Sequence, residues 1–190
     1  IGTMRTIPGM TIINPADAVE ARAAVEAAIN FNGPVYMRFG RLAVPVIYDE
    51  ASYKLEIGRG IKMADGSDVT IIATGVTVAM ALEARATLAA EGIDAAVVNI
   101  HTIKPLDREL VIAEARKTGA IVTAEEHNII GGLGEAVCAA TAEAYPVPVL
   151  RVGVEDRFGR SGKVPPLLEM YGITPANIAA KAREAVKLKK

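Results

Sequence analysis

From residue 69 onward, short segments that are apolar throughout alternate with segments of helical character. The apolar segments predict strands at 69–73, 95–100, 120–124 and 147–152. A strand that is apolar on both faces must be buried on both faces, which requires a parallel sheet between layers of helices. The predicted helices are 76–90, 106–117, 133–144, 164–170 and 175–187. The sequence therefore predicts a three-layer α/β domain built on a mostly parallel five-stranded sheet.

The beginning of the chain has a smaller pattern of strand, helix and strand. The apolar run 10–13 leads into Asn14-Pro15-Ala16-Asp17, whose polar cap residues and proline are typical of a helix start. An alanine-rich helix at 18–29 ends before Asn32-Gly33-Pro34, and a second strand follows at 35–39. Because a crossover helix joins parallel strands, we expect the two strands to be neighbours or near-neighbours in one sheet.

This front βαβ unit is too small to be a domain. Two strands and one helix cannot cover both faces of a parallel sheet, and so short a unit is near the lower limit for independent folding. We therefore expect residues 1–47 to be the end of a larger domain whose earlier strands lie outside this sequence. The Pro45 and polar segment that follow place the domain boundary within 46–56, and the second domain within 56–190.

Composition excludes several classes of function. Twenty-one basic and 22 acidic residues give a formal net charge of −1 with mixed signs along the chain, so the sequence lacks the clustered basic face that nucleic-acid binding needs. No apolar stretch is long enough to span a bilayer. The single cysteine, Cys138, cannot form an internal disulfide, which favours a reducing, cytoplasmic compartment.

Several motifs along the chain occur in a characteristic order. The front unit contains an Arg-x-Ile-Pro run at 4–10, the Pro-x-Asp at 13–17 and the strand 33–41. The second domain contains Thr74-Gly75, the segments 98–107 and 125–134, and Asp156-Arg157-Phe158-Gly159 within 154–162. Together these motifs resemble the transketolase superfamily of thiamine-diphosphate-dependent enzymes. They are most similar to the C-terminal subunit of split bacterial transketolases, in which the two halves of the enzyme are separate polypeptides.

The resemblance implies the C-terminal part of an enzyme that transfers a two-carbon ketol unit between sugar phosphates, as in the pentose phosphate pathway. The complete enzyme would use thiamine diphosphate and Mg²⁺, whose ligands and catalytic groups would lie in segments upstream or on a separate N-terminal subunit. We therefore expect this chain to hold no catalytic, cofactor or metal residue and to be inactive alone. The expected assembly is a homodimer or a heterotetramer with the N-terminal subunit.

Other functions stay open at the level of sequence. Within the same superfamily, the alternatives are 1-deoxy-D-xylulose-5-phosphate synthase and the beta chain of a 2-oxo-acid dehydrogenase. The α/β domain could also be a non-catalytic module that stabilises an assembly. A nucleotide-binding domain of another class is disfavoured, because Gly131-Gly132-Leu133-Gly134 lacks the full spacing of a dinucleotide fingerprint. Tight packing between a strand and a helix explains these glycines better.

Two arginines at the end of the front unit are the candidate substrate-binding residues. Arg41 matches the family position, just past a strand end, at which an arginine holds the sugar phosphate. A guanidinium suits this task because its planar donor fork meets phosphate oxygens bidentately. Arg38 lies within the predicted strand, so we expect a carboxylate or phosphate partner for it.

The two histidines, His101 and His127, each follow a strand end and lack the surrounding ligands of a metal site. Glu125-Glu126-His127 could be read as an acid–base cluster, since adjacent carboxylates can separate their pKa values. The interpretation we favour is a hydrogen-bonded loop network at an interface between domains or subunits.

Overall fold

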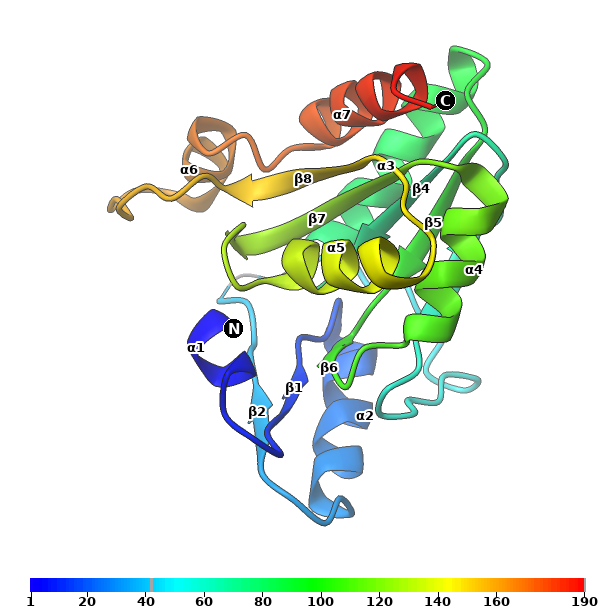
Figure 1. Ribbon diagram of the computed structural model, residues 1–190. Coiled ribbons are helices and arrows are strands. Elements are labelled where there is room, and N and C mark those ends of the chain that lie inside the picture. The colour runs from blue at the N-terminus through cyan, green and yellow to red at the C-terminus, as the bar shows by residue number, and fades with distance from the viewer. Residues whose placement is uncertain (42, 190) are drawn as a thin grey trace.

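The computed structural model describes residues 1–41 and 43–189 and contains two sheets, one above the other in Figure 1. The larger sheet has five strands in the order β3-β5-β4-β7-β8. Their bounds are β3 Ile61–Ala64, β4 Val69–Ala73, β5 Ala95–Asn99, β7 Ile121–Asn128 and β8 Val149–Val154. The last four of these strands are parallel, and β3 joins the β5 edge in the antiparallel sense. The prediction of a mostly parallel five-stranded sheet is confirmed.

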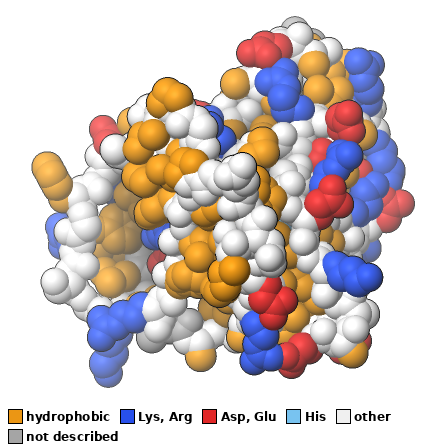
Figure 2. Space-filling view, turned by 90° about the horizontal axis from the view of Figure 1, so that it is seen from below, with side chains coloured by type: hydrophobic (Ala, Val, Ile, Leu, Met, Phe, Trp, Pro, Cys, Tyr) orange, Lys and Arg blue, Asp and Glu red, His pale blue; other side chains and the backbone are white. Residues whose placement is uncertain are grey.

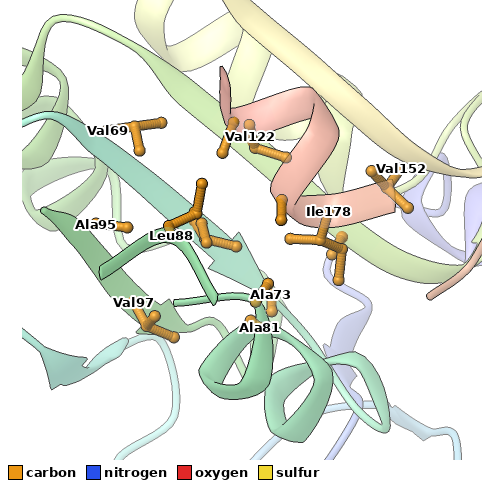
Figure 3. Packing of buried hydrophobic residues seen from close by; sticks show 14 of the residues in the cluster. Val69, Ala73, Ala81, Leu88, Ala95, Val97, Val122, Val152 and Ile178 are labelled. Atoms are coloured by element: carbon orange, nitrogen blue, oxygen red, sulfur yellow. The ribbon is translucent and has the colours of Figure 1, made fainter. Parts of the chain in front are cut away.

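Helices cover both faces of the large sheet, as its apolar strands require. On one face, α3 (Thr77–Ala90) and α7 (Pro175–Lys187) pack on the side chains of Val69, Ile71 and Ala73, a cluster that Figure 3 shows from close by. On the other face, α4 (Arg108–Thr118) and α5 (Leu133–Ala144) pack on Ile72 and its neighbours. Successive residues of β4 thus point to opposite faces and are buried on both, which gives the predicted three layers.

The smaller sheet has three strands in the order β2-β1-β6. Strands β1 (Thr11–Ile13) and β2 (Val35–Met37) pair in parallel and are joined by α2 (Ala18–Ile29), which confirms the predicted βαβ unit. The third strand, β6 (Thr102–Lys104), comes from the connection between β5 and α4 and pairs antiparallel with β1. The front unit is therefore completed on one edge by a strand from the later part of the chain.

The structure corrects several sequence-based boundaries. Strand β6 and the short helix α1 (Gly2–Arg5) were not predicted, and β3 lies where the sequence indicated only an irregular glycine-rich segment. Strand β7 continues to Asn128, four residues past the predicted end. Both missed strands are short and lie at sheet edges, where pairing with a distant partner outweighs a weak local pattern. Helix α6 (Val164–Met170) has the predicted bounds.

Much apolar surface of the front unit is exposed in this chain. Helix α2 buries only Glu20 and Ala24, whereas Ile29 is 77% exposed and Val25 is 40% exposed. Figure 2 looks onto this end of the molecule and shows hydrophobic side chains gathered on it. The expected larger domain around residues 1–47 and the boundary within 46–56 remain predictions. Within the described ranges, none of the helices has the length and apolar character needed to cross a membrane.

The two sheets meet where β1 and β4 end. The Asn14 side chain donates to Thr74 Oγ1 at 3.3 Å, and the Gly75 amide donates to the Asn14 carbonyl at 3.2 Å. Gly75 has a φ of 59°, and a Cβ built there would lie 2.6 Å from Asn14 Nδ2. Glycine is therefore required at this position by both its backbone conformation and the close approach of the front unit.

A comparison of two glycines tests this contact. We expect Gly92→Ala to lower the free energy of unfolding by about 1 kcal/mol, because its φ is 80° but no atom lies within 4 Å of the added methyl group. Gly75→Ala carries the same backbone penalty and also displaces Asn14, so its loss should exceed that of Gly92→Ala by at least about 1 kcal/mol. Urea unfolding measures both values; equal losses would contradict a tight junction.

Candidate functional site

The carboxyl ends of strands from both sheets converge on one region. Asn14 follows β1 and contacts Thr74 and Gly75, which follow β4. Arg38 follows β2 and contacts Glu126 near the end of β7. In open α/β sheets, ligands bind outside the carboxyl ends of parallel strands. This region, which also carries Arg41, is therefore the candidate site.

The strand predicted at 35–39 ends at Met37, so Arg38 lies just past β2 and not within it; of the two expected kinds of partner, the structure shows a carboxylate, that of Glu126. The Nη1 of Arg38 donates to the Glu126 carbonyl at 2.5 Å, and its Nη2 lies 3.7 Å from Glu126 Oε2. Its backbone amide donates to the Ile13 carbonyl at 2.9 Å, which continues the β1–β2 ladder by one step. Both side chains are partly exposed, so the ion pair contributes modestly to stability and mainly fixes the direction of Arg38.

Arg41 is exposed and lies in the loop that leaves β2. It makes no hydrogen bond or ion pair with any other residue that the structure describes. Arg41 lines a hollow of about 260 Å³ together with Glu83 and Glu126. The remaining walls are apolar and come from the loop, α3 and α6, namely Gly40, Ala43, Val44, Pro45, Val76, Ala79, Met80, Val164, Pro165 and Leu168. The geometry leaves the Arg41 guanidinium able to meet an anion at the rim.

Glu125 has a structural role. Its side chain is fully buried, and its two oxygens accept the backbone amides of Leu133 and Gly134, each at 2.8 Å. These amides belong to the first turn of α5, where no intrahelical partner exists. Burial raises the pKa of the Glu125 carboxyl. The residue therefore caps a helix and does not face the candidate site as a free acid.

His127 completes the predicted network. Its Nδ1 lies 2.7 Å from the Asn128 carbonyl, and its Nε2 accepts the Gly2 amide at 3.4 Å. This arrangement needs a neutral ring with the proton on Nδ1, and burial lowers the pKa of His127 accordingly. With Arg38 bound to Glu126, the Glu125-Glu126-His127 segment joins the front unit to the large sheet. The prediction of a loop is wrong, because Glu125, Glu126 and His127 lie within β7, whereas the predicted hydrogen-bonded contacts between the front unit and the large sheet are present.

The glycine run between β7 and α5 is explained by packing. A Cβ at Gly132 would meet the Glu125 carboxylate, and one at Gly134 would lie 2.7 Å from the Arg151 side chain. Both positions need glycine because a neighbouring side chain occupies the space. The packing interpretation therefore holds for Gly132 and Gly134, whereas Gly131 has a φ of 75°, a backbone conformation that favours glycine.

His101 is buried between the two sheets. Its carbonyl accepts the Asn14 amide at 2.8 Å, and its Nδ1 lies 2.9 Å from Thr102 Oγ1. Burial lowers the pKa of His101 to about 4, opposed by the nearby Asp107 carboxylate. The ring is therefore a neutral part of the interface at physiological pH.

The buried His101 predicts a pH dependence of stability. The folded-state pKa is lower than the unfolded value, so the unfolded chain binds the extra proton, and stability is lost as the pH falls from about 6.5 to 4. We expect this residue to contribute on the order of a few kcal/mol over that window. The free energy of unfolding of His101→Gln should fall less steeply than that of the wild type. Parallel curves from urea unfolding would contradict the assignment, since the other titrating groups are shared.

The described residues do not fit a Mg²⁺-diphosphate site. Such a site needs several carboxylate or carbonyl oxygens gathered at one place. Within 1–41 and 43–189, no group of three or more His, Cys, Asp and Glu side chains could hold a metal ion. Of the acidic side chains near the candidate site, Glu125 is bound to a helix start and Glu126 to Arg38, which leaves Glu83 as a single carboxylate on the wall of the hollow.

Sequence reasoning missed a buried polar cluster behind the site. Glu20 accepts hydrogen bonds from the Tyr53 hydroxyl, the Asn99 amide and the Ala16 backbone, and Asn99 also donates to the Tyr48 hydroxyl. These residues come from α2, β5 and the linker between the two units. A glutamate within an alanine-rich helix was the only signal available, and it does not identify partners so distant in sequence.

Comparison with known families gives two matches along the chain. Residues 58–178 match the family model described as transketolase, C-terminal domain. Residues 1–46 match the model described as transketolase, pyrimidine binding domain.

Individual relatives agree with these matches. The chain is 44% identical over 189 residues to the 6-deoxy-6-sulfo-D-fructose transketolase subunit SqwH of Clostridium sp. (strain MSTE9), covering all of this chain and 58% of that protein. It is 39% identical to a subunit of the apulose-4-phosphate transketolase of Phocaeicola vulgatus, covering 98% of this chain and 60% of that protein. It is also 43% identical to the 1-deoxy-D-xylulose-5-phosphate synthase of Heliobacterium modesticaldum, covering 97% of this chain and 29% of that enzyme.

A solved structure has nearly the same backbone. The structure described as "Split gene transketolase, inactive beta4 tetramer" superposes with a TM-score of 0.97 at 48% identity, covering all of this chain and 62% of that one. The chain thus spans a little over half the length of the transketolase subunits that it matches.

Proposed function

This chain belongs to the transketolase family, and we propose that it is the C-terminal part of a transketolase that transfers a two-carbon ketol unit between sugar phosphates. Two observations support this function. The chain matches both a pyrimidine-binding and a C-terminal transketolase model, in that order. Two relatives, which match nearly the whole length of this chain, are named as subunits of transketolases.

Thiamine diphosphate, with Mg²⁺, would supply the carbanion chemistry of the reaction. Because the described residues do not fit a diphosphate site, we assign the cofactor ligands to parts of the enzyme outside this chain. The contribution of this chain is then to bind and orient the substrate. A chain with this role is inactive until it assembles with the part of the enzyme that binds the cofactor.

We assign the terminal phosphate of the sugar to Arg41, with Arg38 as a second residue of the site. The observation that carries this assignment is the exposed Arg41 at the rim of a hollow, unpaired among the described residues. Arg38 is held by Glu126, which lines the same hollow as Arg41, so its guanidinium is oriented before a substrate binds. A guanidinium paired in this way still has donors free for a phosphate oxygen.

The runner-up function is that of a 1-deoxy-D-xylulose-5-phosphate synthase. It is favoured by the 43% identity to such an enzyme, close to the identity with the transketolase subunits. The transketolase interpretation is favoured by the matches to two transketolase subunits and by the 48% identity to a solved split-gene transketolase. An assay of the assembled enzyme with a ketose phosphate donor, set against one with pyruvate, separates the two functions.

We further propose that the partner is an N-terminal subunit or segment with the cofactor-binding domain. The two would assemble as a homodimer of complete chains or as a heterotetramer, in the cytoplasm. The exposed apolar side chains of α2 support a partner at the front unit, since surface of this kind marks interaction sites. The sugar could differ from the usual pentose phosphates, because two relatives are named for a sulfosugar and for apulose 4-phosphate.

Replacement of Arg41 tests the substrate assignment. In the assembled enzyme, Arg41→Ala should raise the KM for a phosphorylated ketose by about tenfold or more, because a charge-assisted contact to phosphate is lost. The KM for the same ketose without its phosphate should change little. The matched control is Arg183→Ala on α7, which removes a partly exposed arginine paired with Glu91 and should leave both KM values unchanged. An unchanged KM for the phosphorylated ketose in Arg41→Ala would contradict the assignment of the phosphate to Arg41.

Calorimetry tests where the cofactor binds. Titration of thiamine diphosphate and Mg²⁺ into this chain alone should give no binding heat, because the described residues offer no cluster of oxygen ligands. The same titration into the assembled enzyme should show binding. Micromolar binding to this chain alone would contradict the proposal that the cofactor ligands lie outside it.

A further inference from the structure

The loop that carries Arg41 is held at both ends by side chains of the protein. Its near end is Arg38, whose guanidinium binds Glu126 and whose amide binds Ile13. Its far end is the backbone of Ile47 and Tyr48. Both of these amides donate to Asp17 Oδ2, at 2.8 and 3.0 Å. The described part of the loop, 39–41 and 43–46, therefore lies between two fixed points.

Asp17 uses its two oxygens for two separate tasks. Oδ1 accepts the Glu20 amide at 2.8 Å and so caps the first turn of α2. Oδ2 accepts the two linker amides. The side chain is 4% exposed, so its hydrogen bonds are shielded from water. A buried carboxylate with acceptors on both sides joins the start of α2 to the end of the Arg41 loop.

The polar cluster around Glu20 fixes the position of Tyr48, whose amide is bound to Asp17. Asn99 Nδ2 donates to both Glu20 oxygens, at 2.9 and 3.0 Å, and to the Tyr48 hydroxyl at 2.7 Å. Tyr48 is thereby bound through its backbone to Asp17 and through its ring to β5 of the large sheet. The far end of the loop cannot shift without breaking contacts to both units.

We propose that Asp17 is a positioning residue for phosphate binding. It holds the far end of the Arg41 loop, so that Arg41 meets the substrate phosphate at a fixed place rather than from a mobile loop. The inference rests on the proposed function of Arg41. It adds a residue that does not touch the substrate and that acts through the backbone of Ile47 and Tyr48.

Asparagine at position 17 separates the two tasks. An amide has one oxygen, which can still cap α2, and asparagine is a preferred capping residue. Its other terminal atom is a donor, which would face the donor amides of Ile47 and Tyr48. Asp17→Asn therefore keeps the helix cap and releases the loop. Asp17→Ser is a second route to the same result, because serine also caps helices but is too short to reach the linker.

The chain contains a matched control for this change. Asp107 caps α4 by accepting the Leu110 amide on Oδ1 at 3.1 Å, and accepts the Gly60 amide on Oδ2 at 2.9 Å. It is 7% exposed and has the same pair of tasks as Asp17, at the other end of the linker. Asp107→Asn makes the same chemical change without touching the Arg41 loop.

The experiment uses the assembled enzyme with these variants and measures kcat and KM for a ketose phosphate and for the same ketose without phosphate. Asp17→Asn and Asp17→Ser should raise the KM for the phosphorylated ketose by about tenfold, the size expected for a weakened charge-assisted contact. The kcat and the KM for the unphosphorylated ketose should change less than about twofold. Asp107→Asn should leave the KM of both sugars unchanged. Hydrogen exchange of the Ile47 and Tyr48 amides should become faster only in the Asp17 variants.

The outcomes distinguish this inference from the function on which it rests. Suppose that Arg41→Ala raises the KM for the phosphorylated ketose, while both Asp17 variants leave it unchanged, as Asp107→Asn does. The positioning role of Asp17 is then wrong, and the proposed function of Arg41 stands. If the Asp17 variants raise KM for both sugars equally, the role is general stability and the inference is overturned. If the wild type does not distinguish the two sugars, the proposed phosphate site fails, and the inference fails with it.

Discussion

The antiparallel pairing of β1 with β6 is the interaction on which the rest of the structure depends. Strand β6 belongs to the connection between β5 and α4, so the pairing ties the small front unit to the core of the large sheet. It gives β1 a partner on each edge and buries Ile12 and Ile13 completely. Without it, a two-stranded βαβ unit would have to hold its shape with one helix, which such units do poorly in water.

The candidate site follows from this pairing. It brings the carboxyl ends of β1 and β2 toward those of β4 and β7, where Asn14 meets Thr74 and Arg38 meets Glu126. The acidic residues at this junction are bound to backbone amides or to an arginine. Among the described residues that line the hollow between the loop, α3 and α6, Arg41 carries the positive charge, and Glu83 and Glu126 carry negative charges. A basic group in that place suits recognition of an anionic substrate and leaves the chemistry to a cofactor held elsewhere.

Local signals in the sequence predicted much of the fold. Helices α2, α5, α6 and α7 have the predicted bounds, since capping residues, prolines and glycines act within a few residues of each helix end. The layers of the large sheet follow from strands that are apolar on both faces. Strand β6, the Asp17 contact with the linker and the contacts of Glu20 with Tyr53 and Asn99 could not be predicted, because each joins residues about 30 or more positions apart. For Arg38, the sequence required a partner but did not identify Glu126.

Native-state hydrogen exchange at the β1–β6 pair tests the central claim most directly. The Asn14 amide, which donates to the His101 carbonyl at 2.8 Å, reports on this junction from the β1 side, and the amides of the large sheet report on global unfolding. The account predicts that Asn14 and those β6 amides that bond to β1 are protected and open with one common free energy, because the two strands separate together. Exchange of Asn14 at the rate of an unfolded chain, with the large sheet still protected, would contradict it.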